Sequence, residues 1–127
     1  MSVKRGQELE DRMLGFAVRV GRAADAIPDS RLGRHVAGQL VRSGTSPAAN
    51  YAEADAAESK KDFVHKLGIV LKELRETRVW LRFLLKAELL LESKLTDLVN
   101  ECEQLCKIIA KSRLTATTNL QTRAPRD

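Results

Sequence analysis

The chain has 127 residues, enough for one domain with one core. Charged residues make up 31% of it and aromatic residues only 4%, a balance that favours helices packed through aliphatic side chains and disfavours a β-rich core. The net charge of +5 is compatible with an acidic partner such as nucleic acid, and no apolar run approaches the roughly 20 residues that span a bilayer, so we expect no membrane segment.

The N-terminal stretch 1–7 is polar, contains no signal-peptide core and shows no apolar period, so we expect it to be flexible. From residue 8 the apolar side chains recur in steps of four and three, which predicts an amphipathic helix that ends before Pro28. Glu8 and Arg12 have the spacing of an i,i+4 ion pair. The predicted buried residues of this helix are Leu9, Met13, Phe16, Val20, Ala23 or Ala24, and Ile27.

A second helix is predicted from Arg31, with Asp29 or Ser30 as its N-cap. The segment Ser43-Gly-Thr-Ser-Pro47 then allows two interpretations. Either Ser46 caps a new helix that starts at Pro47, or one long helix continues through the proline and loses a backbone hydrogen bond there. The predicted inward residues of helix two are Leu32, Val36, Leu40 and Val41.

Ser59 and Asp62 form a weak capping box, which predicts the start of a third helix. Its apolar period is the clearest in the chain and comprises Phe63, Leu67, Val70, Leu71, Leu74, Thr77, Leu81, Leu84 and Leu85. A fourth helix is predicted from about Ser93 to Arg113, with inward residues Leu95, Leu98, Val99, Cys102, Leu105, Cys106 and Ile109. The remaining residues, 114–127, show no period, so we expect a disordered tail.

Cys102 and Cys106 lie four residues apart on the apolar stripe of the fourth helix. This spacing does not suit a disulfide, and a structural zinc site needs four ligands, so we predict that both thiols pack in the core of a reduced, cytosolic protein. The sequence contains no Glu-x-x-His pair of the kind that di-iron bundles use. We therefore expect no metal and no cofactor.

Four amphipathic helices with short connections predict an all-α, antiparallel up-down-up-down four-helix bundle over residues 8–113. A bundle of this size has a limited core, and assembly into a homo-oligomer is one usual way to bury more apolar surface.

Two blocks of the sequence have the pattern of a known family. The first is S-G-T-S-P-x-x-N-x-x-E, within SGTSPAANYAEA at 43–54, and the second is K-E-x-x-E-T-x-x-W, within DFVHKLGIVLKELRETRVWL at 62–81. At this separation they resemble the four-helix-bundle family named after the 23S rRNA intervening-sequence proteins. The resemblance extends to the helix count and order from about residue 16 to residue 113.

That family is similar to the accessory variability determinants of diversity-generating retroelements, which are basic pentamers that associate with a reverse transcriptase and nucleic acid. The resemblance implies a homo-oligomer, as a pentameric ring of bundles, with no known catalytic activity. Most members of the family have no established function. This chain reads Gly-Gln-Leu-Val-Arg at 38–42, where many relatives carry adjacent arginines, which weakens helix two as a nucleic-acid surface.

Asn50 and Glu53 lie one turn apart on the face expected to meet the third helix. A carboxylate–amide catalytic site is one interpretation, but no nucleophile, metal set or histidine accompanies them, so we favour a structural polar network that fixes helix register. Trp80 is predicted either to complete the core or to anchor a subunit interface. The predicted members of the network are Asn50, Glu53, Lys72, Glu73 and Glu76.

Basic residues recur along the first three predicted helices and suit phosphate contacts, which are salt-dependent and sequence-blind. For any single stripe a solvated face is the simpler interpretation, but a ring would repeat each stripe into a larger positive surface. The candidates for nucleic-acid binding are Arg12, Arg19, Arg22, Arg31, Arg34, Arg42, Lys72, Arg75, Arg82 and Lys86.

These patterns lead to the hypothesis of a non-enzymatic, homo-oligomeric four-helix-bundle protein that acts as a basic assembly or nucleic-acid-binding module. The alternative is a protein-binding scaffold, which would dock a polymerase or reverse transcriptase without touching nucleic acid. We expect no catalytic residues in either case.

Overall fold

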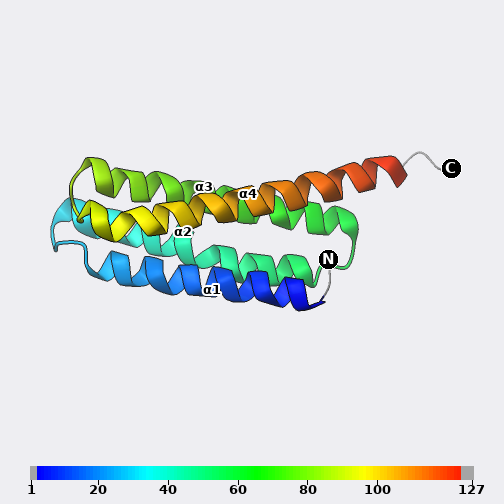
Figure 1. Ribbon diagram of the computed structural model, residues 1–127, viewed down its shortest axis with the longest axis horizontal. Helices are drawn as coiled ribbons and strands as arrows, with labels where there is room; N and C mark the ends of the chain where they lie inside the picture. Colours follow the sequence, from blue (N-terminus) through cyan, green and yellow to red (C-terminus); the bar gives the residue numbers. More distant parts are fainter. Residues whose placement is uncertain (1–2, 124–127) are drawn as a thin grey trace.

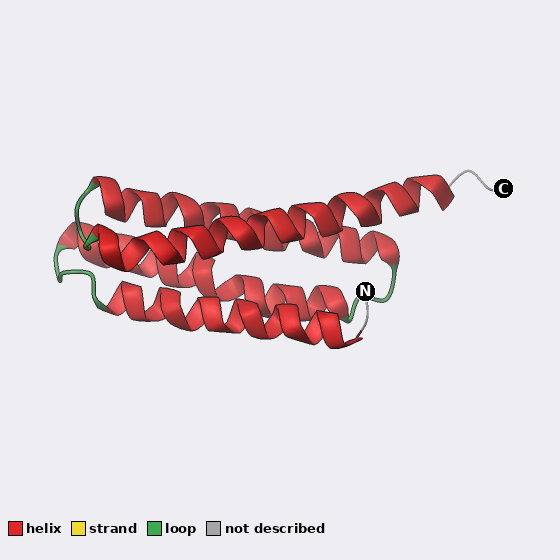
Figure 2. Ribbon diagram, viewed as in Figure 1, coloured by secondary structure: helices red, strands yellow, loops and turns green. Residues whose placement is uncertain are grey.

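The computed structural model describes residues 3–123, which form four helices and no strand. The helices are α1 (Val3–Asp25), α2 (Arg31–Asp55), α3 (Lys60–Lys86) and α4 (Glu92–Arg123). They lie side by side, and the chain turns back on itself at each connection (Figures 1 and 2). The prediction of an all-α protein with four helices is confirmed for this part of the chain. None of these helices is long and apolar enough to cross a membrane.

The ends of the outer helices differ from the prediction. Helix α1 begins at Val3, within the stretch expected to be flexible. Gly6 is buried there, and a Cβ on it would lie 2.9 Å from the Asp55 carboxylate of α2, so close packing against α2 orders these first turns. The two residues before Val3 lie outside the described part of the chain.

Helix α4 continues to Arg123, through most of the segment expected to be disordered. Three of the four threonines at 114–123 bond their hydroxyls within the helix: Thr117 donates to the Arg113 carbonyl at 2.8 Å, Thr118 to the Leu114 carbonyl at 2.9 Å and Thr122 to the Thr118 carbonyl at 2.9 Å. This back-bonding lets threonine side chains remain in a helix without an outside partner. Residues 124–127, the last part of the predicted tail, are not among those described.

The predicted caps of α2 and α3 are confirmed, whereas Ser93, expected to cap the fourth helix, lies inside α4. Ser30 Oγ accepts a hydrogen bond from the Gly33 N–H at 2.9 Å, and Ser59 Oγ accepts one from the Asp62 N–H at 3.1 Å. Helix α2 runs unbroken through Pro47, so the second interpretation of the Ser43–Pro47 segment is the correct one. A proline costs an interior helix one backbone hydrogen bond, and Pro47 is buried, so packing offsets part of that cost.

The core contains most of the predicted apolar faces. Every residue expected to be inward on α1 is buried, with Ala24 rather than Ala23 completing the face, and α3 and α4 bury nearly all of theirs. On α2 the prediction was wrong at Leu32 and Val41, which are 46% and 39% exposed. The inward face of α2 carries small or polar residues that an apolar period does not reveal, among them Gly33, Ser43, Gly44 and Pro47.

Candidate interfaces on the bundle surface

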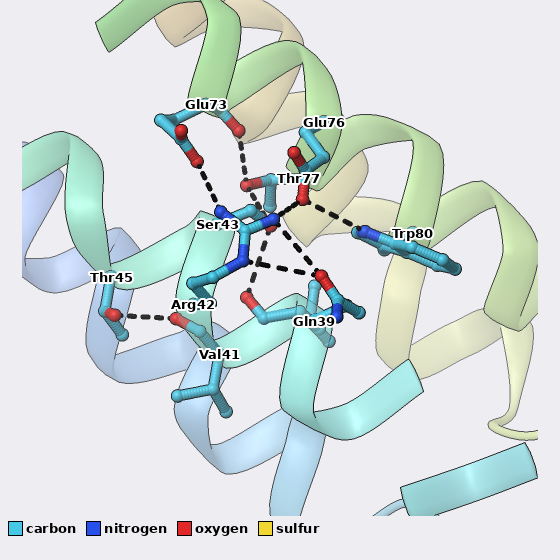
Figure 3. A network of polar contacts seen from close by, with 10 residues as sticks. Gln39, Val41, Arg42, Ser43, Thr45, Glu73, Glu76, Thr77 and Trp80 are labelled. Carbon is cyan, nitrogen blue, oxygen red and sulfur yellow. Dashed lines mark hydrogen bonds and ion pairs between the residues drawn. The ribbon is translucent and has the colours of Figure 1, made fainter. Parts of the chain in front are cut away.

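A polar network, consisting of Gln39 and Arg42 of α2 with Glu73 and Glu76 of α3, joins the two helices (Figure 3). The Arg42 guanidinium donates to Glu73 Oε2 at 3.1 Å and also to Glu76 Oε2, while Gln39 Oε1 accepts from two of its nitrogens. One planar guanidinium therefore bridges two carboxylates that lie three residues apart on α3. We call this group the Arg42 network.

A pair of buried hydroxyls lies beneath it. Ser43 and Thr77 are both 0% exposed, and their hydroxyl oxygens are 3.0 Å apart. Thr77 Oγ1 also lies 2.8 Å from the Glu73 carbonyl oxygen, so the hydroxyl groups are satisfied inside the helix contact. Buried polar pairs of this kind favour one register of two helices, because a shift would break the hydrogen bond between them.

An aromatic cluster continues the same face toward the end of α3. Trp80 is half-buried, its ring meets His35 edge-on at 5.9 Å and Phe83 at 5.8 Å, and its indole N–H donates to Glu76 Oε2 at 3.4 Å. Figure 3 shows the indole nitrogen directed toward the Glu76 carboxylate. His35, Trp80 and Phe83, which we call the aromatic cluster, thus combine core packing with an accessible outer edge.

The polar network that was predicted around Asn50 and Glu53 is centred on Arg42 in the structure. Glu73 and Glu76 take part as expected, but their partner is Arg42, which the sequence pattern places among the phosphate contacts. Asn50 is half-buried and Glu53 and Lys72 are exposed, and none of the three forms a side-chain hydrogen bond or ion pair with the other described residues. The register of α2 and α3 is held about two to three turns from Asn50 and Glu53, at Arg42 and Ser43.

Three of the candidate arginines have carboxylate partners. Arg12 forms a two-pronged pair with Glu101 of α4, at 2.8 and 2.7 Å, and not the expected pair with Glu8. Arg34 pairs with Asp29, and Arg42 belongs to its network. The other candidates are exposed and form no ion pair among the residues described: Arg19, Arg22, Arg31, Lys72, Arg75, Arg82 and Lys86.

Four of these cations form a stripe on α3, and none of them pairs with a carboxylate among the described residues. Lys72, Arg75, Arg82 and Lys86 fall within about 80° of one another around the helix axis and extend over about 21 Å. Glu73 and Glu76 face α2, where both pair with Arg42. We call Lys72, Arg75, Arg82 and Lys86 the cationic stripe.

The two cysteines lie in the seam between α3 and α4, as free thiols in the core. Cys102 Sγ donates to the Leu74 carbonyl oxygen at 3.2 Å, and Cys106 is 8% exposed. The Cys106 pKa is lowered to about 7 by a hydrogen bond from Cys102 and by Arg78 and Arg75, against the opposing effect of burial. Arg75 and Arg78 of α3 thus act on a thiol of α4.

No group of three or more His, Cys, Asp or Glu side chains that could hold a metal ion occurs within residues 3–123.

Comparison with known proteins extends over nearly the same range as the bundle. A family model described as 23S rRNA-intervening sequence protein matches residues 7–111. The chain is similar to the crystal structure, at 1.70 Å resolution, of a protein of unknown function from the S23 ribosomal protein family of Bacteroides thetaiotaomicron, with 32% identity and a TM-score of 0.77. That likeness covers 83% of this chain and 97% of the other. A comparison with curated proteins finds no match.

Proposed function

Because the chain belongs to the family of 23S rRNA-intervening sequence proteins, we propose that it is a non-enzymatic, homo-oligomeric module that binds nucleic acid through its phosphates. The observation that carries this is the cationic stripe on α3, four exposed cations that no carboxylate neutralises among the residues described. Cations that are already paired gain little from a phosphate, whereas unpaired ones release the counterions of the nucleic acid when they bind.

Assembly would multiply the effect of one stripe. A single row of four cations touches few phosphates, but a closed ring repeats it at every subunit and builds a large positive surface. Five subunits are the number implied by the resemblance to the retroelement determinants. Cytosolic localisation, where the two free thiols stay reduced, belongs to the same proposal.

The aromatic cluster favours a second candidate function, a scaffold that docks a protein partner and leaves nucleic acid untouched. Trp is enriched at the centres of protein interfaces, and Trp80 with Phe83 offers a half-buried apolar area next to the exposed ring of His35. The two candidates differ in their salt dependence, because phosphate binding weakens steeply with salt and aromatic packing does not.

The test combines light-scattering mass with fluorescence anisotropy of a short RNA duplex over a salt series. Lys72→Gln/Arg75→Gln/Arg82→Gln should lower the affinity for every duplex sequence alike. It should also reduce the slope of log affinity against log salt by about one for each phosphate that the variant no longer binds. Arg34→Gln is the matched control, because Asp29 already neutralises that exposed arginine.

The outcomes separate the candidates. A stable oligomer whose mass rises with RNA at low salt and returns at moderate salt supports the nucleic-acid module. An oligomer whose mass does not change with RNA leaves the protein-binding scaffold as the remaining candidate. A monomer that does not bind RNA contradicts the oligomeric module altogether.

A further inference from the structure

A groove of about 800 Å³ opens at the end of the bundle where α1 and α4 separate. It lies between the first half of α1, the start of α3 and the second half of α4. Its apolar lining comes from all three helices, and comprises Leu9, Phe63, Ile108 and Ala116. Phe63, Ile108 and Ala116 are only half-buried, so this end of the bundle leaves apolar surface uncovered.

The charged residues along the groove are mostly basic. Arg5 and Arg12 contribute from α1, Lys60 from α3 and Lys111 from α4, against the single acid Glu8. Arg12 is neutralised by Glu101. Lys60 and Lys111 are exposed and form no ion pair with another described residue, so the groove keeps a positive rim.

The last part of α4 extends past the ends of the other helices (Figure 1). We call residues 114–123 the overhang. Leu114 is 68% exposed, and four of the ten residues are threonine, which has a low helix propensity. An isolated helix shorter than about 12 residues is marginal in water. Ala116 and Asn119 of the overhang line the groove, so whatever fills the groove also packs against the overhang.

We propose that the groove docks an acidic amphipathic helix from a partner protein. The apolar floor calls for an occupant whose backbone is internally hydrogen-bonded, which a helix provides and an extended peptide does not. The lysines of the rim, Lys60 and Lys111, select carboxylates on the flanks of that helix. A phosphate backbone would satisfy the rim but leave the aliphatic floor exposed.

The dimensions of the groove fit a short helix. The residues of α4 that line it run from Ile108 to Asn119. Along a helix this is about 16 Å, or about three turns. A docked helix of that length would lie between α1 and α4 and give the overhang the packing partner that the chain itself does not supply within residues 3–123.

The probes are three synthetic helical peptides of about 15 residues. The first has one leucine face with glutamate flanks, the second has the same face with lysine flanks, and the third is a scramble of the first. Hydrogen exchange of the full chain should slow in the overhang when the first peptide is added and not with the other two. The acidic peptide should bind about tenfold more tightly than the basic one.

Variants in and beside the groove assign the site. Lys60→Glu/Lys111→Glu should reverse the preference, so that the basic peptide binds and protects the overhang. Ala116→Arg should block both peptides without changing thermal unfolding, because it lies beyond the packed bundle. Lys107 lies on α4 one turn before Lys111 and does not line the groove. Lys107→Glu should therefore leave the preference for the acidic peptide unchanged.

Several results would overturn the assignment. Equal binding of acidic and basic peptides, or no protection of the overhang by any peptide, removes the acidic helix as the occupant. Protection that is present without peptide and rises with protein concentration assigns the groove to a second copy of the chain. Protection by an RNA duplex assigns it to nucleic acid. None of these readouts depends on the cationic stripe.

Discussion

At the residue scale, Arg42 has the most partners of the polar side chains between α2 and α3. Glu73 and Glu76 lie one turn apart on α3, and their side chains are 14% and 31% exposed, so each feels the other's charge in a partly dehydrated setting. Arg42 removes that repulsion while remaining 50% exposed itself. Its removal therefore costs more than the loss of an ordinary surface ion pair.

We expect Arg42→Met to lower the free energy of unfolding by about 1 kcal/mol, measured by urea denaturation at neutral pH. Most of this should return in Arg42→Met/Glu73→Gln/Glu76→Gln, where no unpaired carboxylates remain. A triple variant less stable than the single one would contradict the idea that repulsion between the carboxylates causes the loss.

The partners of Arg42 could not be predicted from the spacing of residues along the sequence. The sequence singles out all three charged members of the network, but it suggests phosphate as the partner of Arg42 and places the carboxylates with Asn50 and Glu53. The pairing spans 31 and 34 residues along the chain, so it depends on how α2 is rotated against α3. Ser43, whose buried hydroxyl bonds to Thr77 of α3, helps to fix that rotation, and an apolar period does not reveal it.

At the element scale, the packing of α1 against α2 depends on a glycine inside a helix. A Cβ on Gly44 would lie 2.5 Å from Val20 Cγ1, closer than a carbon atom can approach. Val20 is itself 0% exposed, so it has little room to move. The glycine therefore serves close helix packing, and its φ is not in the left-handed region.

We expect Gly44→Ala to destabilise the protein by about 1–3 kcal/mol through overpacking, despite the higher helix propensity of alanine. Gly38→Ala on the same helix is the matched control. No atom lies within 4 Å of a Cβ at Gly38, so this change should raise stability by about 0.5–1 kcal/mol. Chemical denaturation of both variants checks the pair, and effects of the same sign would refute the close-packing account.

Helices α1 and α4 are joined by the pair of Arg12 with Glu101. A hydrogen bond from Arg12 lowers the pKa of Glu101 below its ordinary value of 4.5, with further help from the charges of Arg12 and Arg19 and against the effect of burial. A depressed pKa in the folded state means that the carboxylate stabilises the fold above the unfolded-state pKa. This contribution is lost as the pH falls through the folded-state pKa.

We therefore expect Glu101→Gln to be less stable than the natural protein at pH 7, by about 0.5 kcal/mol after allowance for solvent screening. The difference in stability should begin to close below pH 4.5. It should vanish as the pH falls through the lowered pKa of Glu101, where this carboxylate becomes protonated in the natural protein. Asp29→Asn is the control, because Asp29 and Arg34 are 85% and 65% exposed and such a pair contributes little. A gap that persists at the acid end of the titration would indicate an effect of packing in place of charge.

At the scale of the whole molecule, four helices and most of the core faces could be predicted from the sequence, because the apolar residues of α1, α3 and α4 recur with the helical period. The overhang could not be predicted, because residues 114–123 carry no apolar period. Their hydrogen bonds form within the helix and do not require burial. The ion pairs of Arg12 and Arg42 with carboxylates of other helices were also hidden, because pairs between elements follow from the packing and not from the spacing.

Trp80 is the single tryptophan of the chain, so its fluorescence reports on the aromatic cluster without interference. If the cluster forms the contact between subunits of the proposed oligomer, the exposed edge of Trp80 is shielded from water in the assembly and solvent-exposed in the monomer. Dilution should then shift its emission to longer wavelength at the same concentration at which the light-scattering mass falls. Trp80→Ala should shift that dissociation to higher protein concentration, by about tenfold or more, while the helical circular dichroism is retained.

The control for this experiment is Trp80→Phe, which keeps an aromatic ring against Phe83 and removes only the indole hydrogen bond to Glu76. Its mass should fall at nearly the same concentration as that of the natural protein. An emission maximum that stays constant while the mass falls would place the subunit interface elsewhere on the bundle. Trp80 would then serve the monomer alone, because a ring packed only against its own subunit keeps its surroundings on dissociation.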